Sequence, residues 1–383
     1  MPRIGVVTQW DLGSAWARST SLGPMVERVA GLCDGLVSYG PVELWSDRVR
    51  AVAARASARV PGARAYSPHY SLRRSRELAR IFRRRFEATP CDLVFAPKGS
   101  INLAFLELPV PVVYVSDATF ALLDGYYPSV SGLSPRSQRA AHEAERLTLT
   151  RADALVFYTR WAADSAIRDY GADPARVHVL PVGPNLDPAA LPPPEALLAQ
   201  RDGSGPCRLL LVGVDWLRKG ADVALETLEA LEARGIDAEL TVVGCKAPPG
   251  VRHPRLRVVP FLSKKDPLQR AELMSLFREA SFLLVPTRAE CYGCVFVEAS
   301  AWALPSLATV TGGVPEVVQD GVNGFCFPLE ARGEVYAERI AQLLADPPAY
   351  RALCASSRQR FEQALNWDAW AAGMAEIVRG LLG

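Results

Sequence analysis

The segment from Ser281 to Pro305 constrains the fold of this chain more than any other stretch of its sequence. It begins with an apolar run, Phe282 to Val285, that predicts a buried strand, and it continues from about Val295 in a pattern typical of a helix. Gly293 lies in the loop between them. A strand, a glycine-containing loop and a helix start form a phosphate site in α/β proteins, because the N–H groups and dipole of the helix attract anions. The segment therefore predicts an α/β sheet with an anion site at one edge.

Two glutamates flank this predicted site with seven residues between them. Glu290 precedes the predicted helix, and Glu298 lies about five residues into it, which is an advance of about 7 Å along the axis. A carboxylate is repelled by a nearby pyrophosphate, so both acids are better explained as hydrogen-bond acceptors for hydroxyl groups. We expect Glu298 to hold a ribose and Glu290 to hold a sugar on the other side of the phosphates.

These residues resemble the donor-site signature of the retaining GT-B glycosyltransferases of glycosyltransferase family 4. That signature has two glutamates separated by seven residues with a glycine-containing loop after the first, and the sequence here is ECYGCVFVE at 290–298. The motifs GGVPE at 312–316 and DGVNG at 320–324 also fit. Two acids at this spacing are common by chance, but together with the downstream motifs the resemblance covers most of the C-terminal half.

Length and composition set the remaining limits. A chain of 383 residues exceeds what one core normally organises, which predicts two α/β domains, and a net charge of +2 gives no indication of a nucleic-acid partner. The opening sequence MPRIGVVTQWDLG is not typical of a secretory signal peptide and no apolar run is long enough to span a membrane, so we expect a cytoplasmic protein. The eight cysteines and four histidines lack disulfide-framework or metal-ligand spacing, and we expect no cofactor and no protein-bound metal.

The N-terminal half begins with RIGVVTQ at 3–9, which predicts a first strand followed by a loop that carries Gly13 and Ser14. Ligands of open α/β sheets bind beyond the carboxyl ends of the strands, so this loop is expected at such a position. A turn would explain Gly13 equally well, whereas the resemblance implies that the loop helps to form the donor and acceptor cleft. A helix at about 24–38 and a strand at 42–45 are expected to follow.

Strands are also expected at 92–96 and 110–115, and the second of these leads into Ser116 and Asp117. Many family members have a histidine beside the reacting sugar at the end of the equivalent strand. Here that position holds Ser116 or Asp117, and the sequence does not decide between them. We expect Asp117 to contact substrate, with a helix N-cap as the alternative.

The segment LRRSRELARIFRRRF at 72–86 predicts an amphipathic helix. Its apolar residues Leu78, Ile81, Phe82 and Phe86 share one face. The remaining surface carries seven arginines: Arg73, Arg74, Arg76, Arg80, Arg83, Arg84 and Arg85. A solvated surface helix is one explanation. The other is a basic face, Arg73–Arg85, that contacts an anionic membrane or an anionic acceptor and makes the protein peripheral to the membrane.

The second domain is expected to begin with the strand CRLLLV at 207–212, followed by Gly213 and the basic pair Arg218 and Lys219. A basic pair at the carboxyl end of a strand, opposite the Glu290 loop, would stabilise a diphosphate leaving group; a solvated surface pair is the alternative. The family motif here is a glycine, an arginine, a short spacer and Lys-Gly. The lysine and its following glycine match, but the arginine position holds Val214, and we expect Arg218 to supply that charge.

A proline-rich stretch at 187–206 predicts a linker. We therefore expect an acceptor-side domain at 1–187, a donor domain at 188–366, and an amphipathic helix at 367–383. The resemblance implies that the two Rossmann-like domains face each other across a deep cleft and that the last helix crosses back to the first domain. Cys291 and Cys294 form a CxxC at a helix start, where thiolates are stabilised, so a redox centre is the competing interpretation of this loop.

The resemblance implies metal-independent transfer of a sugar from a nucleoside diphosphate sugar to a small-molecule, glycan or lipid acceptor, with retention of configuration. Lys219 and Arg218 would stabilise the diphosphate. Donor-binding backbone is expected from Gly13, Ser14, Gly213, Gly293, Cys294 and Val295. A sugar-nucleotide epimerase or phosphorylase on the same fold, and a sugar-nucleotide sensor without turnover, are the alternatives. The sequence decides neither the base, nor the sugar, nor the acceptor.

Overall fold

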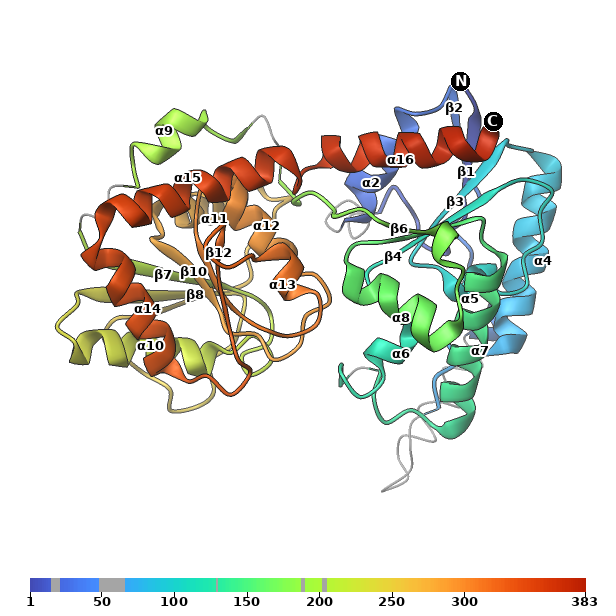
Figure 1. The fold of residues 1–383 in the computed structure, drawn as a ribbon. Coiled ribbons are helices and arrows are strands. Elements are labelled where there is room, and N and C mark those ends of the chain that lie inside the picture. The colour runs from blue at the N-terminus through green and yellow to red at the C-terminus, as the bar shows by residue number, and fades with distance from the viewer. Residues whose placement is uncertain (15–20, 48–65, 129, 187–189, 202–204) are drawn as a thin grey trace. The chain divides into compact units, whose positions relative to one another are not determined.

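The computed structural model describes residues 1–14, 21–47, 66–128, 130–186, 190–201 and 205–383. Within these ranges the chain forms two compact units, Met1–Pro181 with Trp370–Gly383, and Val182–Ala369 (Figure 1). Each unit is built on one sheet of six described strands with flanking helices. The boundary expected between residues 187 and 188 lies outside the described residues.

The sheet of the first unit has the order β2-β1-β3-β4-β5-β6, and every neighbouring pair is parallel. Its strands are β1 (Arg3–Val6), β2 (Gly35–Ser38), β3 (Leu93–Pro97), β4 (Val112–Ser116), β5 (Ala154–Phe157) and β6 (Val177–Val179). The central strands β3 and β5 are buried along their whole length, which is why they are continuous apolar runs in the sequence. The chain order reverses at β1 and β3, so ligand-binding loops are expected at the carboxyl ends of these strands.

Two sequence predictions near the start of this unit are wrong. Helix α2 (Leu22–Ala30) ends at Gly31, and the residues expected to complete a helix up to 38 form the edge strand β2 instead. No strand is present at 42–45. Residues 35–38 pair with residues 3–6, and this contact between distant parts of the chain is absent from any local pattern.

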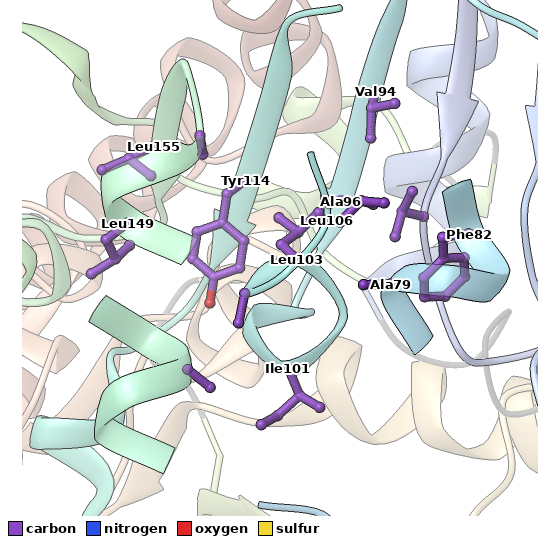
Figure 2. Close-up of a cluster of buried hydrophobic side chains, with 14 of the residues drawn as sticks. Ala79, Phe82, Val94, Ala96, Ile101, Leu103, Leu106, Tyr114, Leu149 and Leu155 are labelled. Atoms are coloured by element: carbon purple, nitrogen blue, oxygen red, sulfur yellow. The ribbon is translucent and has the colours of Figure 1, made fainter. Parts of the chain in front are cut away.

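The helices of the first unit pack on this sheet: α4 (Leu72–Ala88), α5 (Ser100–Leu103), α6 (Phe120–Leu123), α7 (Pro135–Arg151), α8 (Arg160–Tyr170) and the short 3₁₀ helix η1 (Pro174–Arg176). Figure 2 shows part of the core, where Phe82 of α4 and Leu149 of α7 lie with Val94 and Tyr114 of the sheet. Side-chain oxygens of Ser71, Ser134 and Thr159 cap α4, α7 and α8. Burial of these apolar side chains is the main stabilising contribution.

Helix α4 corresponds to the amphipathic helix expected at 72–86, but its arginines are not one uniform surface. Arg74 is buried, and its guanidinium donates to both carboxylate oxygens of Asp47 and to the amide oxygen of Gln9. Arg85 donates to the backbone carbonyls of Tyr39 and Pro41. The prediction of seven arginines on a shared basic face is therefore corrected for Arg74, and the exposed arginines of α4 are these six: Arg73, Arg76, Arg80, Arg83, Arg84 and Arg85.

The sheet of the second unit has the order β12-β11-β10-β7-β8-β9, again with parallel neighbours throughout. Its strands are β7 (Cys207–Val212), β8 (Ala238–Val243), β9 (Leu256–Val259), β10 (Phe282–Val285), β11 (Ser306–Thr309) and β12 (Gly324–Phe327). The strands expected at 207–212 and 282–285 are confirmed. The chain order reverses between β7 and β10, so the loops that follow these two strands form the topological switch point.

The helices of this unit are α9 (Pro194–Leu198), α10 (Ala221–Ala233), α11 (Pro267–Glu279), α12 (Cys294–Ala301), α13 (Val314–Val317), α14 (Gly333–Ala345) and α15 (Pro347–Gln363). The last helix, α16 (Trp367–Leu382), belongs to the first unit from Trp370 onward (Figure 1). Trp370 is buried there, with its ring 6.4 Å from that of Phe95. The expected return of the last helix to the first domain is confirmed. No helix among the described residues is both long and apolar enough to cross a membrane.

Candidate functional site

Two loops meet at the switch point of the second sheet, residues 213–220 after β7 and residues 286–293 after β10. The backbone N–H of Arg288 donates to the carbonyl of Arg218 at 2.7 Å, and the hydroxyl of Thr287 donates to the same carbonyl at 3.0 Å. Because β7 and β10 are parallel neighbours, both loops leave the same edge of the sheet. The structure thereby brings the basic pair to the Glu290 loop.

The centre of this site is a cluster of one carboxylate and two cations. The ammonium of Lys219 pairs with Oε2 of Glu290, and Nη1 of Arg218 lies 3.6 Å from the same oxygen. Arg218 also donates to the carbonyl of Ala289 at 3.0 Å. The three charged side chains are mostly withdrawn from water, so their charges are weakly screened and the cluster keeps a net positive charge. Such a cluster attracts an anion more strongly than an exposed pair would.

Two glycines allow the loops to approach this closely. A Cβ on Gly213 would lie 2.5 Å from Cγ of Lys219, so the lysine stem occupies the space that a side chain would need. Gly220 has φ of +74°, and a Cβ there would lie 2.0 Å from the carbonyl oxygen of Pro286. The Lys-Gly sequence is therefore a structural requirement of the contact between the loops.

Helix α12 begins at this site, and its N-cap is Gly293 with φ of +82°. A Cβ on Gly293 would lie 2.6 Å from the ring of Phe296, so a larger residue is excluded by both conformation and space. A glycine provides no side chain to cap the helix, and the first-turn residues Cys294 and Val295 present their backbone at its positive end. This is the arrangement that phosphate-binding helix starts use.

Glu298 lies in α12 and is only 4% exposed. Its carboxylate pairs with the ammonium of Lys264, from the loop between β9 and α11. Sequence analysis did not single out Lys264, which directly follows the segment PFLS at 260–263. The two glutamates of the motif therefore have separate cationic partners.

A second ion pair fixes the same two loops. The guanidinium of Arg288 donates to both carboxylate oxygens of Asp222 in the first turn of α10, at 2.8 and 2.7 Å. Hydrogen bonds to Asp222 raise the pKa of Arg288. Burial of Asp222 opposes its ionisation, but the hydrogen bonds and charge of Arg288 outweigh this, and the pKa of Asp222 is below its usual value. Sequence analysis missed this pair, which joins residues far apart in the chain.

The site residues expected in the first unit lie after its first and fourth strands. The N–H groups of Gly13 and Ser14 donate to Oδ1 and to the backbone carbonyl of Asp11, at 2.9 and 3.0 Å. These two hydrogen bonds close a turn at Asp11–Ser14, where the described part of the loop after β1 ends. Gly13 therefore lies in a turn, as one of its two explanations from the sequence required. The residues that complete the loop, 15–20, lie outside the described part of the chain.

Asp117 pairs with Lys98 at 2.8 Å, at the carboxyl ends of β4 and β3, and about a third of each side chain is exposed. The N-cap of α6 is Thr119, so the alternative that Asp117 caps a helix is wrong. The hydroxyl of Ser116 is buried and donates to the carbonyl of Ala118 at 2.8 Å. Of the two candidates for the family's histidine position, only Asp117 presents a polar group to solvent.

Neither cysteine of the CxxC is in a disulfide; Cys291 is buried and Cys294 is partly exposed. Among the described residues, no group of three or more histidine, cysteine, aspartate or glutamate side chains is arranged to hold a metal ion. The switch point assembles the charged groups of Lys219, Arg218 and Glu290, with the pair of Arg288 and Asp222 beside them.

Comparison with known proteins identifies the class. Residues 206–346 match the family model "Glycosyl transferases group 1", and residues 12–183 match "Glycosyl transferase 4-like domain". The structure is similar to Anabaena HepE in complex with UDP (TM-score 0.68, 17% identity, all of both chains covered). It is also similar to sucrose-phosphate synthase from Thermosynechococcus elongatus (TM-score 0.66, 17% identity, 99% of this chain and 98% of that one). At these identities the likeness shows the fold, which is GT-B.

The chain belongs to glycosyltransferase family 4. A curated relative, D-inositol 3-phosphate glycosyltransferase of Xylanimonas cellulosilytica, is 32% identical over 251 residues, which are 61% of this chain and 58% of the relative. The chain spans a little over half the length of the curated relatives it matches.

Proposed function

We propose that this chain transfers a glycosyl group from a nucleoside diphosphate sugar to an acceptor, without a metal ion and with retention of anomeric configuration. The observation that carries the proposal is the cluster of Lys219, Arg218 and Glu290 beside the glycine-capped start of α12. The name of the curated relative supports the reaction class. The solved structures of HepE in complex with UDP and with UDP-glucose support the donor class.

The diphosphate is assigned to the cluster and the start of α12. Lys219 and Arg218 supply positive charge, and the backbone at Gly293, Cys294 and Val295 supplies N–H donors along the helix dipole. Charge that develops on a leaving diphosphate is stabilised by groups already in place, which costs little reorganisation during the reaction. In this proposal Arg218 takes the electrostatic role left open by Val214.

The two glutamates are assigned to the two ends of the donor. Glu290 lies in the loop before α12 and would accept hydrogen bonds from the donor sugar, while its Oε2 also pairs with Lys219. Glu298 lies one turn into α12 and would accept hydrogen bonds from the ribose, while its carboxylate also pairs with Lys264. An ionised carboxylate offers several lone pairs, so one cationic partner leaves capacity for a hydroxyl.

Retention is inferred from the family resemblance and needs no side-chain nucleophile. In a front-face displacement, the bond from the anomeric carbon to the diphosphate oxygen breaks, and its electron pair stays on the diphosphate. The acceptor hydroxyl forms the new bond on the same face, and its proton passes to the leaving diphosphate oxygen. The basic cluster lowers the cost of this step by stabilising the leaving group.

On the acceptor side, Asp117 is proposed as a polar contact to substrate. Its pair with Lys98 places one negative and one positive group at neighbouring strand ends, and both remain accessible. The exposed arginines of α4 are proposed to allow peripheral contact with an anionic membrane, because each basic residue near such a surface contributes about 1 kcal/mol. The acceptor itself, whether a small molecule, a glycan or a lipid, is not assigned.

The test is a thermal-shift screen of uridine, guanosine and adenosine diphosphates and their sugars, followed by turnover assays with the donor that stabilises the protein most. Ligand at a hundred times its Kd raises stability by roughly 2.7 kcal/mol. Lys219→Met, which keeps the stem over Gly213, should lose turnover by a factor on the order of a hundred. Lys265→Met, an exposed lysine outside the cluster, serves as the matched control.

The outcomes separate the alternatives. Donor binding without consumption would identify a sensor, and release of a new sugar without any acceptor would identify an epimerase. Equal loss in both lysine variants would contradict the assignment of Lys219 to the diphosphate.

A further inference from the structure

The first unit contains a pocket of about 800 Å³ between the start of α4, the first half of α7 and the end of α8. Two kinds of side chain dominate its lining. The basic ones are Arg73, Arg76, Arg136, Arg139 and Arg146, and the aromatic ones are Tyr66, Tyr70, His142 and Tyr170. None of these residues belongs to the switch-point cluster of the second unit.

The carboxylates at this pocket do not balance its arginines. Only Glu143 and Asp169 line it. Glu143 is held by Arg146 through two hydrogen bonds of 2.9 and 2.8 Å, and Asp169 is held by Arg168 in the same manner. Each acid is therefore already neutralised by an arginine of its own helix. The positive charge of the other four arginines in the lining is therefore not balanced by a carboxylate of the pocket.

The four remaining arginines, Arg73, Arg76, Arg136 and Arg139, make no ion pair among the described residues. Arg76 lies over the ring of Phe105, 4.3 Å from its centroid. Arg136 and Arg139 are three positions apart on α7, and Arg73 and Arg76 are three positions apart on α4. Residues at this spacing share a helix face, and like charges there are destabilising. Two such unfavourable pairs around one cavity are stabilised when an anion lies between them.

The shape of guanidinium groups indicates which kind of anion this pocket can bind. An arginine binds phosphate through two parallel N–H bonds, so four arginines on opposite walls suit a phosphate ester better than a diffuse surface charge would. The first turns of two long helices, α4 and α7, also contribute to the lining, and their positive ends add to the potential.

The aromatic wall is fixed by its own contacts. Ring centroids lie 5.1 Å apart for Tyr70 and Phe120, 4.9 Å for Phe120 and His142, and 6.0 Å for His142 and Tyr170. The Tyr170 hydroxyl interacts with Nδ1 of His142 at 2.9 Å and accepts the N–H of Ala121 at 3.0 Å. Rigid rings with an apolar face and polar edges suit a molecule that has both C–H and hydroxyl groups.

We propose that this pocket binds a phosphorylated sugar, either free or as the headgroup of a lipid, with its phosphate between the arginines of α4 and α7. Binding here is separate from donor turnover in the second unit. The arginines that carry it are those at the start of α4 and on α7, whereas Arg83 and Arg84 of α4 do not line the pocket.

The experiment compares two double variants of the full chain with equal loss of charge. Arg136→Gln with Arg139→Gln removes the α7 pair, and Arg252→Gln with Arg351→Gln removes two exposed arginines of the second unit, away from the pocket and from α4. Titration calorimetry with glucose 6-phosphate should give binding that glucose lacks. The α7 variant should weaken it by about tenfold or more, and the control variant should leave it within about twofold.

Cosedimentation with vesicles of phosphatidylinositol phosphate in phosphatidylcholine, compared with phosphatidylcholine alone, tests the lipid source. Preference for the phosphorylated vesicles that only the α7 variant loses supports a headgroup, and calorimetric binding alone supports a free ligand. Equal losses in the two variants, or no binding of either probe, would overturn the proposal. Thermal unfolding midpoints within a few degrees of the parent protein, and unchanged donor turnover, show that each variant is folded and that the result is independent of the proposed transfer reaction.

Discussion

Glu290 and Glu298 are identical residues in one short motif, yet their surroundings differ. Glu290 lies against two cations in a loop contact, and Glu298 is buried in a helix against one. Burying a carboxylate without a partner is costly, and each glutamate has a lysine that compensates its charge. The chemistry of each position is therefore decided by residues that are distant in the sequence.

Substitution of the two glutamates should have different effects. Glu298→Gln should weaken binding of both the nucleoside diphosphate and its sugar, and Glu290→Gln should weaken mainly the sugar-bearing donor and turnover. Each loss should be on the order of 1–3 kcal/mol, because each change removes charged hydrogen bonds to a different part of the donor. Calorimetry with the free nucleoside diphosphate and with the diphosphate sugar measures how much each substitution weakens the affinity for each ligand. Equal effects on free diphosphate affinity would contradict the two assignments.

Helix α7 contains a buried ionisable group outside the proposed site. Glu145 is 4% exposed and accepts a hydrogen bond from the Tyr114 hydroxyl at 3.3 Å. Burial raises the pKa of Glu145 to about 7, although hydrogen bonds from Ser100 and Tyr114 act in the opposite direction. The folded protein thus holds this proton over a pH range in which the unfolded chain has lost it.

This raised pKa predicts that Glu145 lowers the free energy of unfolding as pH rises, and that Glu145→Gln removes this pH-dependent loss. The folded pKa lies above the unfolded value of 4.5, so the contribution of this group to stability declines as pH rises from about 4.5 to about 7. The variant should be more stable than the parent above pH 7, by up to about 3 kcal/mol, and equal to it near pH 4.5. Urea unfolding at several pH values measures both curves. Parallel curves would show that the carboxyl is not protonated in the folded state.

At the scale of the whole molecule, the proposed reaction depends on positive charge from side chains. Donor turnover should survive 10 mM EDTA, because Lys219 and Arg218 take the electrostatic role that a divalent ion has in metal-dependent transferases. Initial rates with and without chelator, and after addition of Mn²⁺ in excess, measure this. Loss of turnover that Mn²⁺ restores would contradict the proposal.

Strands β7 and β10 lie inside the second sheet and were predictable because each is a short, largely buried apolar run; both have the predicted limits. The edge strand β2 was not predictable from the sequence. Its partner β1 is separated from it by the whole of helix α2, and a pairing over that distance leaves no local pattern. Arg74 looked like its neighbours on α4, and only its contact with Asp47 makes it a core residue.

The sequence by itself determined the class of fold and the segment in which the candidate anion site lies. Strand, glycine loop and helix start are local patterns, and the spacing of Glu290 and Glu298 is fixed along the chain. Only the tertiary structure decided which cation each glutamate faces. Lys264 and Lys219 come from other strand-end loops, and the order of strands in the sheet determines which loops meet. Such contacts leave no periodic pattern, since they join single residues across long stretches of chain.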